Sequence, residues 1–210
     1  IYTNASTDPY TNNDGFNMLA ENQTTIDSVI GSGNYDIGHV FSTGGGGIAA
    51  LQSPCSSVKA EGVTGNNSPV GDAFWVDYVA HEIGHQMGAN HTFNGNVGAC
   101  AGGNRSASTA YEPGSASTIM GYAGICGSDN IANNSDDYFH AKSQQEVASF
   151  TSGSGSSGGT NSITVYQCHY LNAGSNVSIL KHIPCAKQDQ PTHPNRNKLP
   201  NIMAKQKLGE

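Results

Sequence analysis

The sequence predicts an α+β domain whose second half is largely irregular. Three observations support this: two stretches with helical spacing of apolar residues, an alternating stretch between them, and a long segment rich in Gly, Asn and Ser after the second helix. The 210 residues are expected to form one main domain with a small appendage. Apolar residues make up 36% of the chain, which suffices for a core in a domain of ~150 residues.

The first predicted element is an amphipathic helix over residues 15–30. Asp14 is placed to cap its N-terminus, and Gly31 is placed to end it. The residues expected near its apolar face are Phe16, Leu19, Gln23, Ile26 and Ile30.

A strand is expected next, over residues 35–43, because polar and apolar residues alternate well enough for burial of at least one face. The following segment, 44–51, begins with four glycines and predicts a turn or an edge strand with an unobstructed backbone. Residues 52–72 are rich in Ser, Gly, Asn and Pro and are expected to be a loop.

The second helix is predicted over residues 74–88, with Asp72 as its cap and Gly88 as its stop. From 89 to 137 the chain has almost no periodic pattern, and a loop of that length is usually functional or disordered. A final helix is expected over residues 138–150.

Charge is distributed unevenly along the chain, whose formal net charge is −7. Residues 1–160 hold 3 basic and 14 acidic side chains, whereas residues 161–210 hold 6 basic and 2 acidic ones. With so few basic side chains, residues 1–160 cannot neutralise a phosphate backbone, which disfavours nucleic acid as a partner. Residues 153–160 have the composition of a flexible Gly/Ser linker, and 161–210 form a basic tail without a predicted structure.

Few Lys and many Asn, Ser, Thr and Gly favour a secreted protein. The five cysteines show no CxxC spacing, so a cysteine zinc site is disfavoured, and Cys100 and Cys126 are candidates for a disulfide across the loop between them. The sequence has no apolar run long enough to span a membrane. It begins at Ile1 without a signal peptide, so we expect the signal and pro-region to lie upstream. A monomer is expected.

Residues 81–91, HEIGHQMGANH, have the spacing of a zinc site. His81 and His85 are four residues apart, so on a helix they share one face and can bind one metal ion. Glu82 lies next to the first ligand, where it can act as general base towards a metal-bound water. Gly88 permits a left-handed turn, which would bring His91 to the same metal as third ligand. His39 and His140, in contrast, are expected to be ordinary core or surface histidines.

This segment resembles the metzincin clan of zinc metallopeptidases, whose extended pattern it matches at every defined position. The resemblance implies a mixed twisted sheet, an active-site helix and a smaller irregular C-terminal subdomain, together forming a catalytic domain over residues 1–152. It also implies a Met-containing turn beneath the metal, and STIMGY (117–122) supplies Met120 for it. Because metzincins usually begin with a further strand and helix, the domain is expected to be truncated at its N-terminus.

Within the clan, the chain looks most like bacterial reprolysin-like (M12B-like) peptidases. The stretches that carry this resemblance are YDIGHVFSTGGGGIA, YVAHEIGHQMGANHTFNG and TAYEPGSASTIMGYAGICG. The long glycine-rich insert between the third histidine and Met120, flanked by Cys100 and Cys126, supports it. Thr92 departs from venom-type reprolysins, which carry Asp there, and HTF (91–93) is similar to pappalysins instead.

Three further sites have competing interpretations. Tyr122 matches a tyrosine that ligates zinc or stabilises the oxyanion in astacin-like and serralysin-like relatives, or it packs in the core. Residues 128–137 are rich in oxygen ligands and could bind Ca²⁺, or they form a solvated loop. The glycine segment is either a plain loop or the edge strand that pairs with an extended substrate. Its candidate residues are Gly45, Gly46, Gly47 and Ile48.

Together these patterns predict a zinc-dependent endopeptidase that hydrolyses peptide bonds in proteins. One alternative is a zinc-binding adhesion or recognition module without turnover, or an inactive truncated fragment. Another is a zinc hydrolase acting on a non-peptide bond, which suits the edge-strand segment less well.

Overall fold

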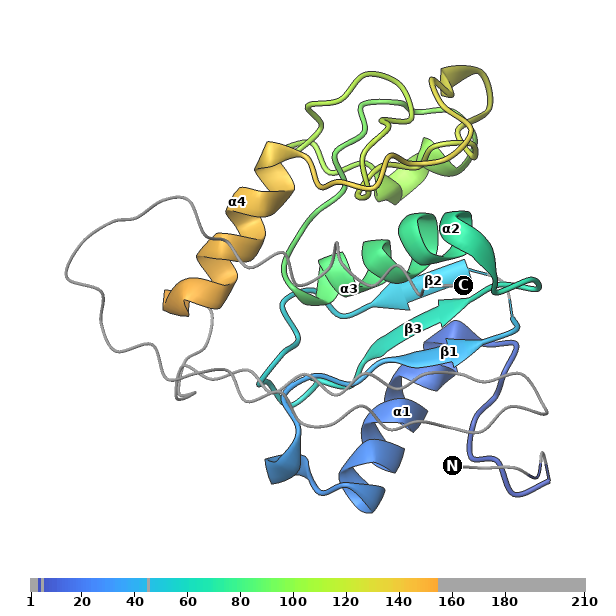
Figure 1. Cartoon of the computed structure of the whole chain (residues 1–210), viewed down its shortest axis with the longest axis vertical. Coiled ribbons are helices and arrows are strands. Elements are labelled where there is room, and N and C mark those ends of the chain that lie inside the picture. The colour runs from blue at the N-terminus through green and yellow to red at the C-terminus, as the bar shows by residue number, and fades with distance from the viewer. Residues whose placement is uncertain (1–3, 5, 45, 155–210) are drawn as a thin grey trace, which may run out of the picture.

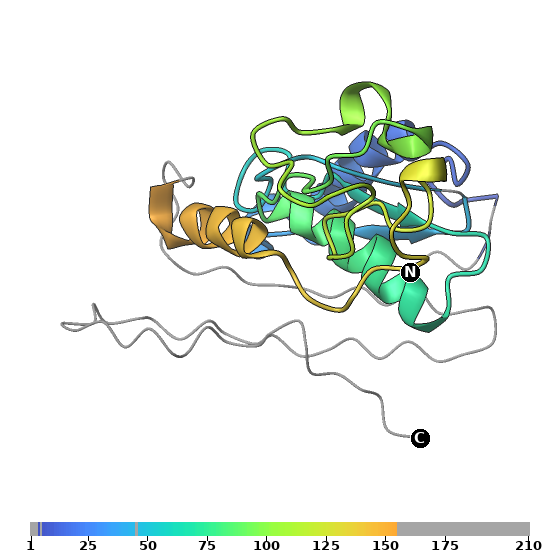
Figure 2. The same ribbon diagram turned by 90° about the horizontal axis from the view of Figure 1, so that it is seen from above.

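The computed structural model describes residues 4, 6–44 and 46–154 (Figure 1). A three-stranded sheet lies between helix α1 (Gly15–Val29) on one face and the helix that ends in α3 (His81–Gln86) on the other. The loops that follow α3 form a separate lobe above this helix, and helix α4 (Ala141–Ser149) lies beside it. A second view at right angles shows the long helix crossing the sheet (Figure 2). The predicted α+β class is confirmed.

The sheet is mixed, with the order β1-β3-β2. Strand β1 (Val40–Ser42) pairs in parallel with β3 (Gly62–Gly65), and β2 (Gly46–Ala49) pairs antiparallel with β3 at the open edge. The glycine segment therefore forms an edge strand rather than a plain turn. The strand expected over 35–43 is shorter than predicted, although its predicted burial is confirmed by Tyr35, which is 2% exposed.

The central strand β3 lies within the segment predicted to be a loop, so that prediction is wrong. Its sequence, GVTG, has a glycine at each end and no alternation, because all four residues are buried. A short strand that is covered on both faces has no polar face for a periodic pattern to reveal.

Helix α1 agrees with the predicted bounds, and Asp14 caps it by accepting a hydrogen bond from the Asn17 backbone N–H at 3.1 Å. Its predicted apolar face is partly wrong, because Phe16 is 76% exposed. The buried residues are Met18, Asn22 and Ile26, so in the first turns the buried face is shifted by one residue from the predicted face. Asn22 can occupy this face because its amide donates to the Ala60 carbonyl oxygen at 2.6 Å.

The second helix is continuous from Gly71 to Gln86 and begins three residues earlier than predicted. Its first turn is α2 (Gly71–Ala73), its middle (Phe74–Ala80) is wound as a π-helix, and its end is α3. Asp72 therefore lies inside the first turn and is not the cap. Gly88 has a φ of 99°, so the left-handed turn predicted after α3 is confirmed.

Beyond α3 the described chain is mostly loop, as expected, with short 3₁₀ turns at Gly98–Cys100, Gly102–Asn104 and Gly127–Asp129. Cys100 and Cys126 form a disulfide, which is fully buried together with Phe93 and Ala116. Helix α4 follows, begins after His140 and continues as a turn over Phe150–Ser154. His140 is an ordinary structural histidine, whose Nδ1 accepts a hydrogen bond from the Lys142 backbone N–H at 3.0 Å.

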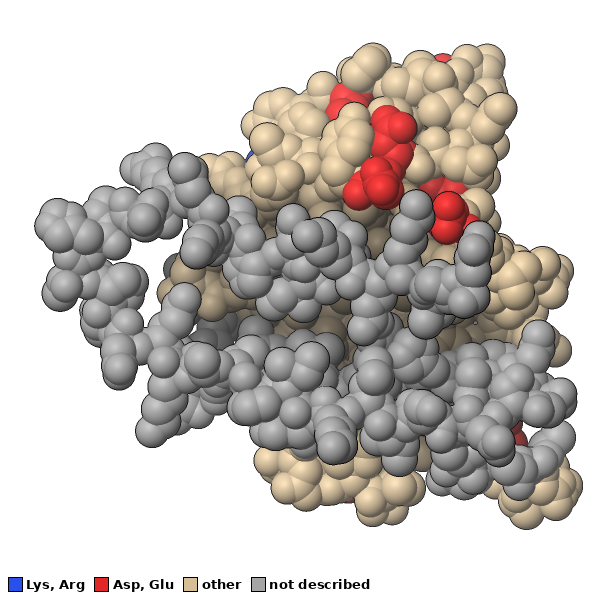
Figure 3. Space-filling model, viewed as in Figure 1, with Lys and Arg blue, Asp and Glu red and all other residues tan. Residues whose placement is uncertain are grey.

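The predicted linker and basic tail lie outside the described residues, except for residues 153 and 154, which end that last turn. None of the described helices is long and apolar enough to cross a membrane. Where the surface is described, Figure 3 shows acidic side chains gathered on the lobe above the long helix.

A buried polar network joins the long helix to the sheet. His39 is 9% exposed, and its two ring nitrogens contact Gln86 Oε1 at 2.7 Å and Thr64 Oγ1 at 2.8 Å. The Gln86 amide also donates to the Gly38 carbonyl oxygen at 2.9 Å. Burial lowers the pKa of His39 from 6.5 to about 4, so this side chain is neutral in the folded protein at neutral pH.

This network predicts an acid-sensitive stability. The unfolded chain binds a proton at His39 near pH 6.5, whereas the folded chain does so only near pH 4, so stability falls as the pH drops between these values. Between pH 8 and pH 5 we expect His39 to account for a loss of roughly 2 kcal/mol in the free energy of unfolding. Urea unfolding at both pH values gives this loss for the wild type and for His39→Gln, and the difference between the two proteins is the contribution of His39. Equal losses in both proteins would contradict it.

Candidate metal centre

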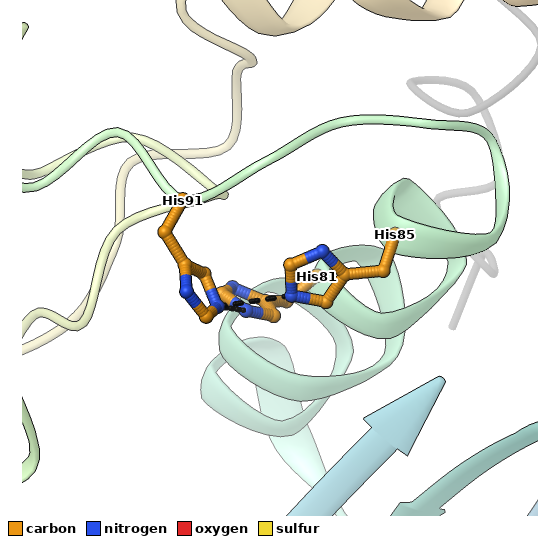
Figure 4. Close-up of side chains that lie close together, drawn as sticks. All are labelled: His81, His85 and His91. Carbon is orange, nitrogen blue, oxygen red and sulfur yellow. Dashed lines mark hydrogen bonds between the residues drawn. The ribbon is translucent and has the colours of Figure 1, made fainter. Parts of the chain in front are cut away.

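Three histidine side chains converge on one point above the long helix (Figure 4). His81 and His85 project from the same face of α3, and His91 reaches them from the loop that follows the turn at Gly88. The Nε2 atom of His91 lies 3.1 Å from Nε2 of His81 and 2.9 Å from Nε2 of His85.

Backbone carbonyl groups fix the protonation of all three rings. Nδ1 of His81 donates to the Ile119 carbonyl oxygen at 2.7 Å, and Nδ1 of His85 donates to that of Ala89 at 2.8 Å. Nδ1 of His91 donates to the Asn104 carbonyl oxygen at 2.5 Å. A carbonyl oxygen only accepts hydrogen bonds, so each Nδ1 carries the proton and each Nε2 of a neutral ring presents a lone pair.

The pKa values of the three histidines favour this neutral form. Burial is the main cause in each case: it lowers the pKa of His81 well below 6.5, that of His85 to about 4, and that of His91 below its ordinary value. Neutral rings cannot form hydrogen bonds between their Nε2 atoms, so the short contacts drawn in Figure 4 bring lone pairs together. A cation between them removes that repulsion.

This donor set fits zinc. Imidazole nitrogens are ordinary zinc ligands, and tetrahedral coordination at ~2.0–2.1 Å places two of them about 3.3 Å apart, close to the separations seen here. The hydrogen bond from each Nδ1 to a carbonyl oxygen is the outer contact that orients a ligating histidine and raises its basicity.

Glu82 follows His81 directly in α3, and its carboxylate packs against Gly47 of strand β2. Its side chain is 7% exposed, and Oε2 is buried without a hydrogen-bond partner in the described part of the chain. Burial raises the pKa of Glu82 to about 8. A buried carboxyl group without a fixed partner has a free atom with which to exchange a proton.

The position of His91 depends on contacts with distant loops. Thr109 Oγ1 donates to the His91 carbonyl oxygen at 2.6 Å, and the next residue, Thr92, donates its backbone N–H to the Met120 carbonyl oxygen at 3.1 Å. The Thr92 carbonyl oxygen in turn accepts from the Glu112 backbone N–H at 2.9 Å.

Glu112 organises the turn that follows. Its carboxylate accepts hydrogen bonds from the backbone N–H groups of Ser117 at 3.2 Å and Thr118 at 3.3 Å, and from Thr118 Oγ1 at 2.6 Å. One carboxylate therefore holds the turn that carries Ile119, whose carbonyl oxygen orients His81.

On its other side, His91 is anchored by helix α4. The Glu146 carboxylate accepts from the Asn90 backbone N–H at 3.1 Å and from the Asn90 side-chain amide at 3.0 Å. Asn90 directly precedes His91, so this two-point contact fixes the chain where it enters the third ligand.

Met120 is fully buried and packs against α3. A Cβ atom at Gly84, between the two helical ligands, would lie 2.5 Å from the Met120 sulfur. Glycine at position 84 is therefore what allows this side chain to lie directly against α3.

Tyr122 packs against two of the three ligands. Its ring centroid is 4.6 Å from that of His91 and 5.5 Å from that of His81. Burial, and secondly the charge of Glu82, raise the pKa of Tyr122 to about 12, so the phenol is protonated at neutral pH. A protonated hydroxyl can donate a hydrogen bond to a developing oxyanion.

The remaining predicted site residues have different outcomes. Gly46, Gly47 and Ile48 lie in the edge strand β2, and Gly45 lies outside the described residues. The calcium hypothesis for residues 128–137 has no support. Asp129 accepts from the Asn96 backbone N–H at 2.8 Å and Asp136 from Ser117 Oγ at 3.0 Å, so these carboxylates bind separate parts of the protein.

Three converging neutral imidazoles with an adjacent buried carboxylate define the class of zinc metallohydrolase sites. Residues 1–92 match the model of the metallopeptidase family M12B, reprolysin-like. The match includes the three histidines and Glu82, and it confirms the resemblance found in the sequence. Met120, Tyr122 and the disulfide lie beyond the matched residues. No curated protein matches the chain.

Several residues around the centre were not found from the sequence. Glu112 and Glu146 lie 21 and 55 residues after His91 in the sequence, and only the folded turns and loops bring them close to His91 and its neighbours. The scarcity of acidic residues in this part of the chain is the one signal that could have drawn attention to them. Asn104 acts through its backbone carbonyl oxygen, for which a sequence has no signal.

The Glu146 contact predicts the affinity for zinc. Glu146→Gln keeps the shape of the side chain but replaces one of its two accepting oxygens with an N–H₂ group, which then faces one of the two donors of Asn90. We expect the dissociation constant for zinc to rise by about tenfold, because partners that orient metal ligands typically contribute that much. Competition with a chromophoric chelator measures it.

Glu21→Gln is the matched control. The Glu21 carboxylate also accepts from one backbone N–H and one side chain, both of Thr11 at 2.7 Å, but it lies on α1. We expect this variant to bind zinc as the wild type does. Unchanged affinity in Glu146→Gln would rule out the anchoring role.

Proposed function

We propose that the chain is a zinc-dependent endopeptidase in which His81, His85 and His91 hold the metal and Glu82 is the general base. The observation that carries this proposal is the convergence of three Nε2 lone pairs beside a buried carboxylate. The family match, which covers all four residues, supports zinc and peptide hydrolysis.

When bound, zinc supplies Lewis acidity, which lowers the pKa of a coordinated water and polarises a substrate carbonyl. The protein supplies the proton acceptor. In this proposal Glu82 Oε2, which has no protein hydrogen-bond partner among the described residues, takes the proton from the attacking water and then delivers it to the leaving amine nitrogen. The Tyr122 hydroxyl is the second polar group in reach and is proposed to stabilise negative charge on the scissile oxygen or to ligate the metal.

The proposed substrate is an extended segment of a protein. Strand β2 is one of the two edge strands of the described sheet, so its outer backbone groups can pair with an added strand. The glycines of β2 keep that backbone accessible. Such pairing recognises main chain, which suits a peptide bond better than other hydrolysable groups.

We further propose that residues 1–152 form the catalytic domain and that Met120 marks the Met-turn of this clan. Its burial against Gly84, directly between the two helical ligands, supports that assignment. An extracellular location is proposed, because the buried Cys100–Cys126 disulfide persists in oxidising compartments.

The proposal predicts that metal binding and hydrolysis can be separated. Glu82→Gln removes the proton acceptor without altering a ligand, so we expect full zinc stoichiometry with a loss of hydrolysis of roughly 10²–10⁴-fold. His85→Ala, which removes a ligand, is expected to lose both. Zinc analysis and digestion of a peptide library by metal-loaded protein measure the two properties.

The same experiment distinguishes the alternatives. Full zinc binding without cleavage of any peptide by the wild type would identify a recognition module or an inactive fragment. Cleavage by Glu82→Gln at the wild-type rate would remove Glu82 from the mechanism.

A further inference from the structure

Helix α3 contacts the sheet through two polar side chains that are four residues apart. Glu82 lies over strand β2 and Gln86 lies over the neighbouring strand β3, and each meets a glycine. A Cβ atom at Gly62 would lie 2.5 Å from Cδ of Gln86 and 2.5 Å from Nδ1 of His39. At this position, glycine makes room for the buried network described above.

Gly47 has the same relation to Glu82. A Cβ atom at position 47 would lie 2.5 Å from both Cγ and Cδ of Glu82 and would overlap Oε1. Real Cβ atoms are essentially never found this close to another heavy atom. The strand cannot easily retreat, because Gly47 pairs with Thr64 of the buried strand β3.

The backbone conformation does not account for glycine at this position. Gly46 has a φ of 90°, which favours glycine whatever surrounds it. Gly47 is not among the glycines with positive φ, so an L-residue could adopt its backbone conformation. The nearest atoms that an added side chain at position 47 would meet are therefore those of the Glu82 carboxylate end, which would have to move.

Glu82 depends on this contact for its position. Oε2 is buried and makes no hydrogen bond in the described part of the chain, so no such bond directs it. The bare backbone at Gly47 is the surface against which the carboxylate end of Glu82 packs.

We propose that Gly47 is a positioning residue, whose uncovered backbone sets the place of the Glu82 carboxylate at the metal centre. This inference rests on the proposed function only in that Glu82 is taken as the general base. The contact between Gly47 and Glu82 itself exists whatever the reaction.

A stability cycle in the metal-free protein tests the contact alone. Gly47→Ala is expected to lower the melting temperature by roughly 5 °C when Glu82 is present, because the added methyl overlaps its carboxylate. In the Glu82→Ala background the same change is expected to cost less than about 1 °C, because an alanine side chain has no atoms beyond Cβ to meet the added methyl. Equal losses in both backgrounds would overturn the proposal. If Gly47→Ala alone does not fold, a folded double variant supports the contact, and a double variant that also fails to fold overturns it.

Kinetics of the zinc-loaded protein test the consequence. Displacement of the base predicts that Gly47→Ala keeps its zinc and its KM but loses roughly 10²-fold in kcat, equally for a short and a long peptide. Gly33→Ala is the matched control, because a Cβ atom there meets nothing within 4 Å. Obstruction of the substrate instead predicts a KM that rises more for the longer peptide while kcat is kept, and this result would overturn a positioning role. A wild type without hydrolysis would refute the proposed function and leave the stability cycle valid.

Discussion

Three backbone carbonyl groups, each accepting a hydrogen bond from a histidine Nδ1, orient the rings so that Nε2 of His91 lies 3.1 Å from that of His81 and 2.9 Å from that of His85. Such an arrangement is unfavourable unless a cation lies between the nitrogens, so the surrounding structure must hold it in place. The carbonyl groups come from the turn after α3 and from two distant loops. Much of the irregular half of the chain serves to bring these groups to the helix.

The irregular half of the chain has little regular secondary structure, and it is stabilised by other contacts. The buried disulfide joins Cys100 to Cys126, the Glu112 carboxylate holds the turn before Met120, and Glu146 holds the residue before His91. The two carboxylates accept hydrogen bonds from backbone N–H groups that no helix or strand pairs, and the disulfide adds a covalent link. The ligand loop is therefore fixed from two sides, by the disulfide-linked lobe and by α4.

Other contacts of α3 depend on close packing against glycines. Glycines at 47, 62 and 84 let Glu82, Gln86 and Met120 lie at distances that any side chain would prevent. One short helix thus presents two of the three converging histidines and a buried carboxylate. The contacts at Gly47 and Gly62 hold the helix against the sheet, and the contact at Gly84 holds it against Met120.

The sequence by itself identified the three converging histidines, the neighbouring carboxylate and the left-handed turn at Gly88, because these depend on residues within eleven positions of one another. It also indicated both main helices and the disulfide. The tertiary structure decided what depends on long-range contact. Strand β3 has no periodic pattern since both its faces are covered. The buried face of α1 includes Asn22, which can be buried because its side-chain amide donates to the distant Ala60 carbonyl oxygen. The roles of Gly47, Glu112 and Glu146 likewise exist only once the fold brings them to Glu82, to the Met120 turn and to Asn90, and no local pattern of residues encodes that approach.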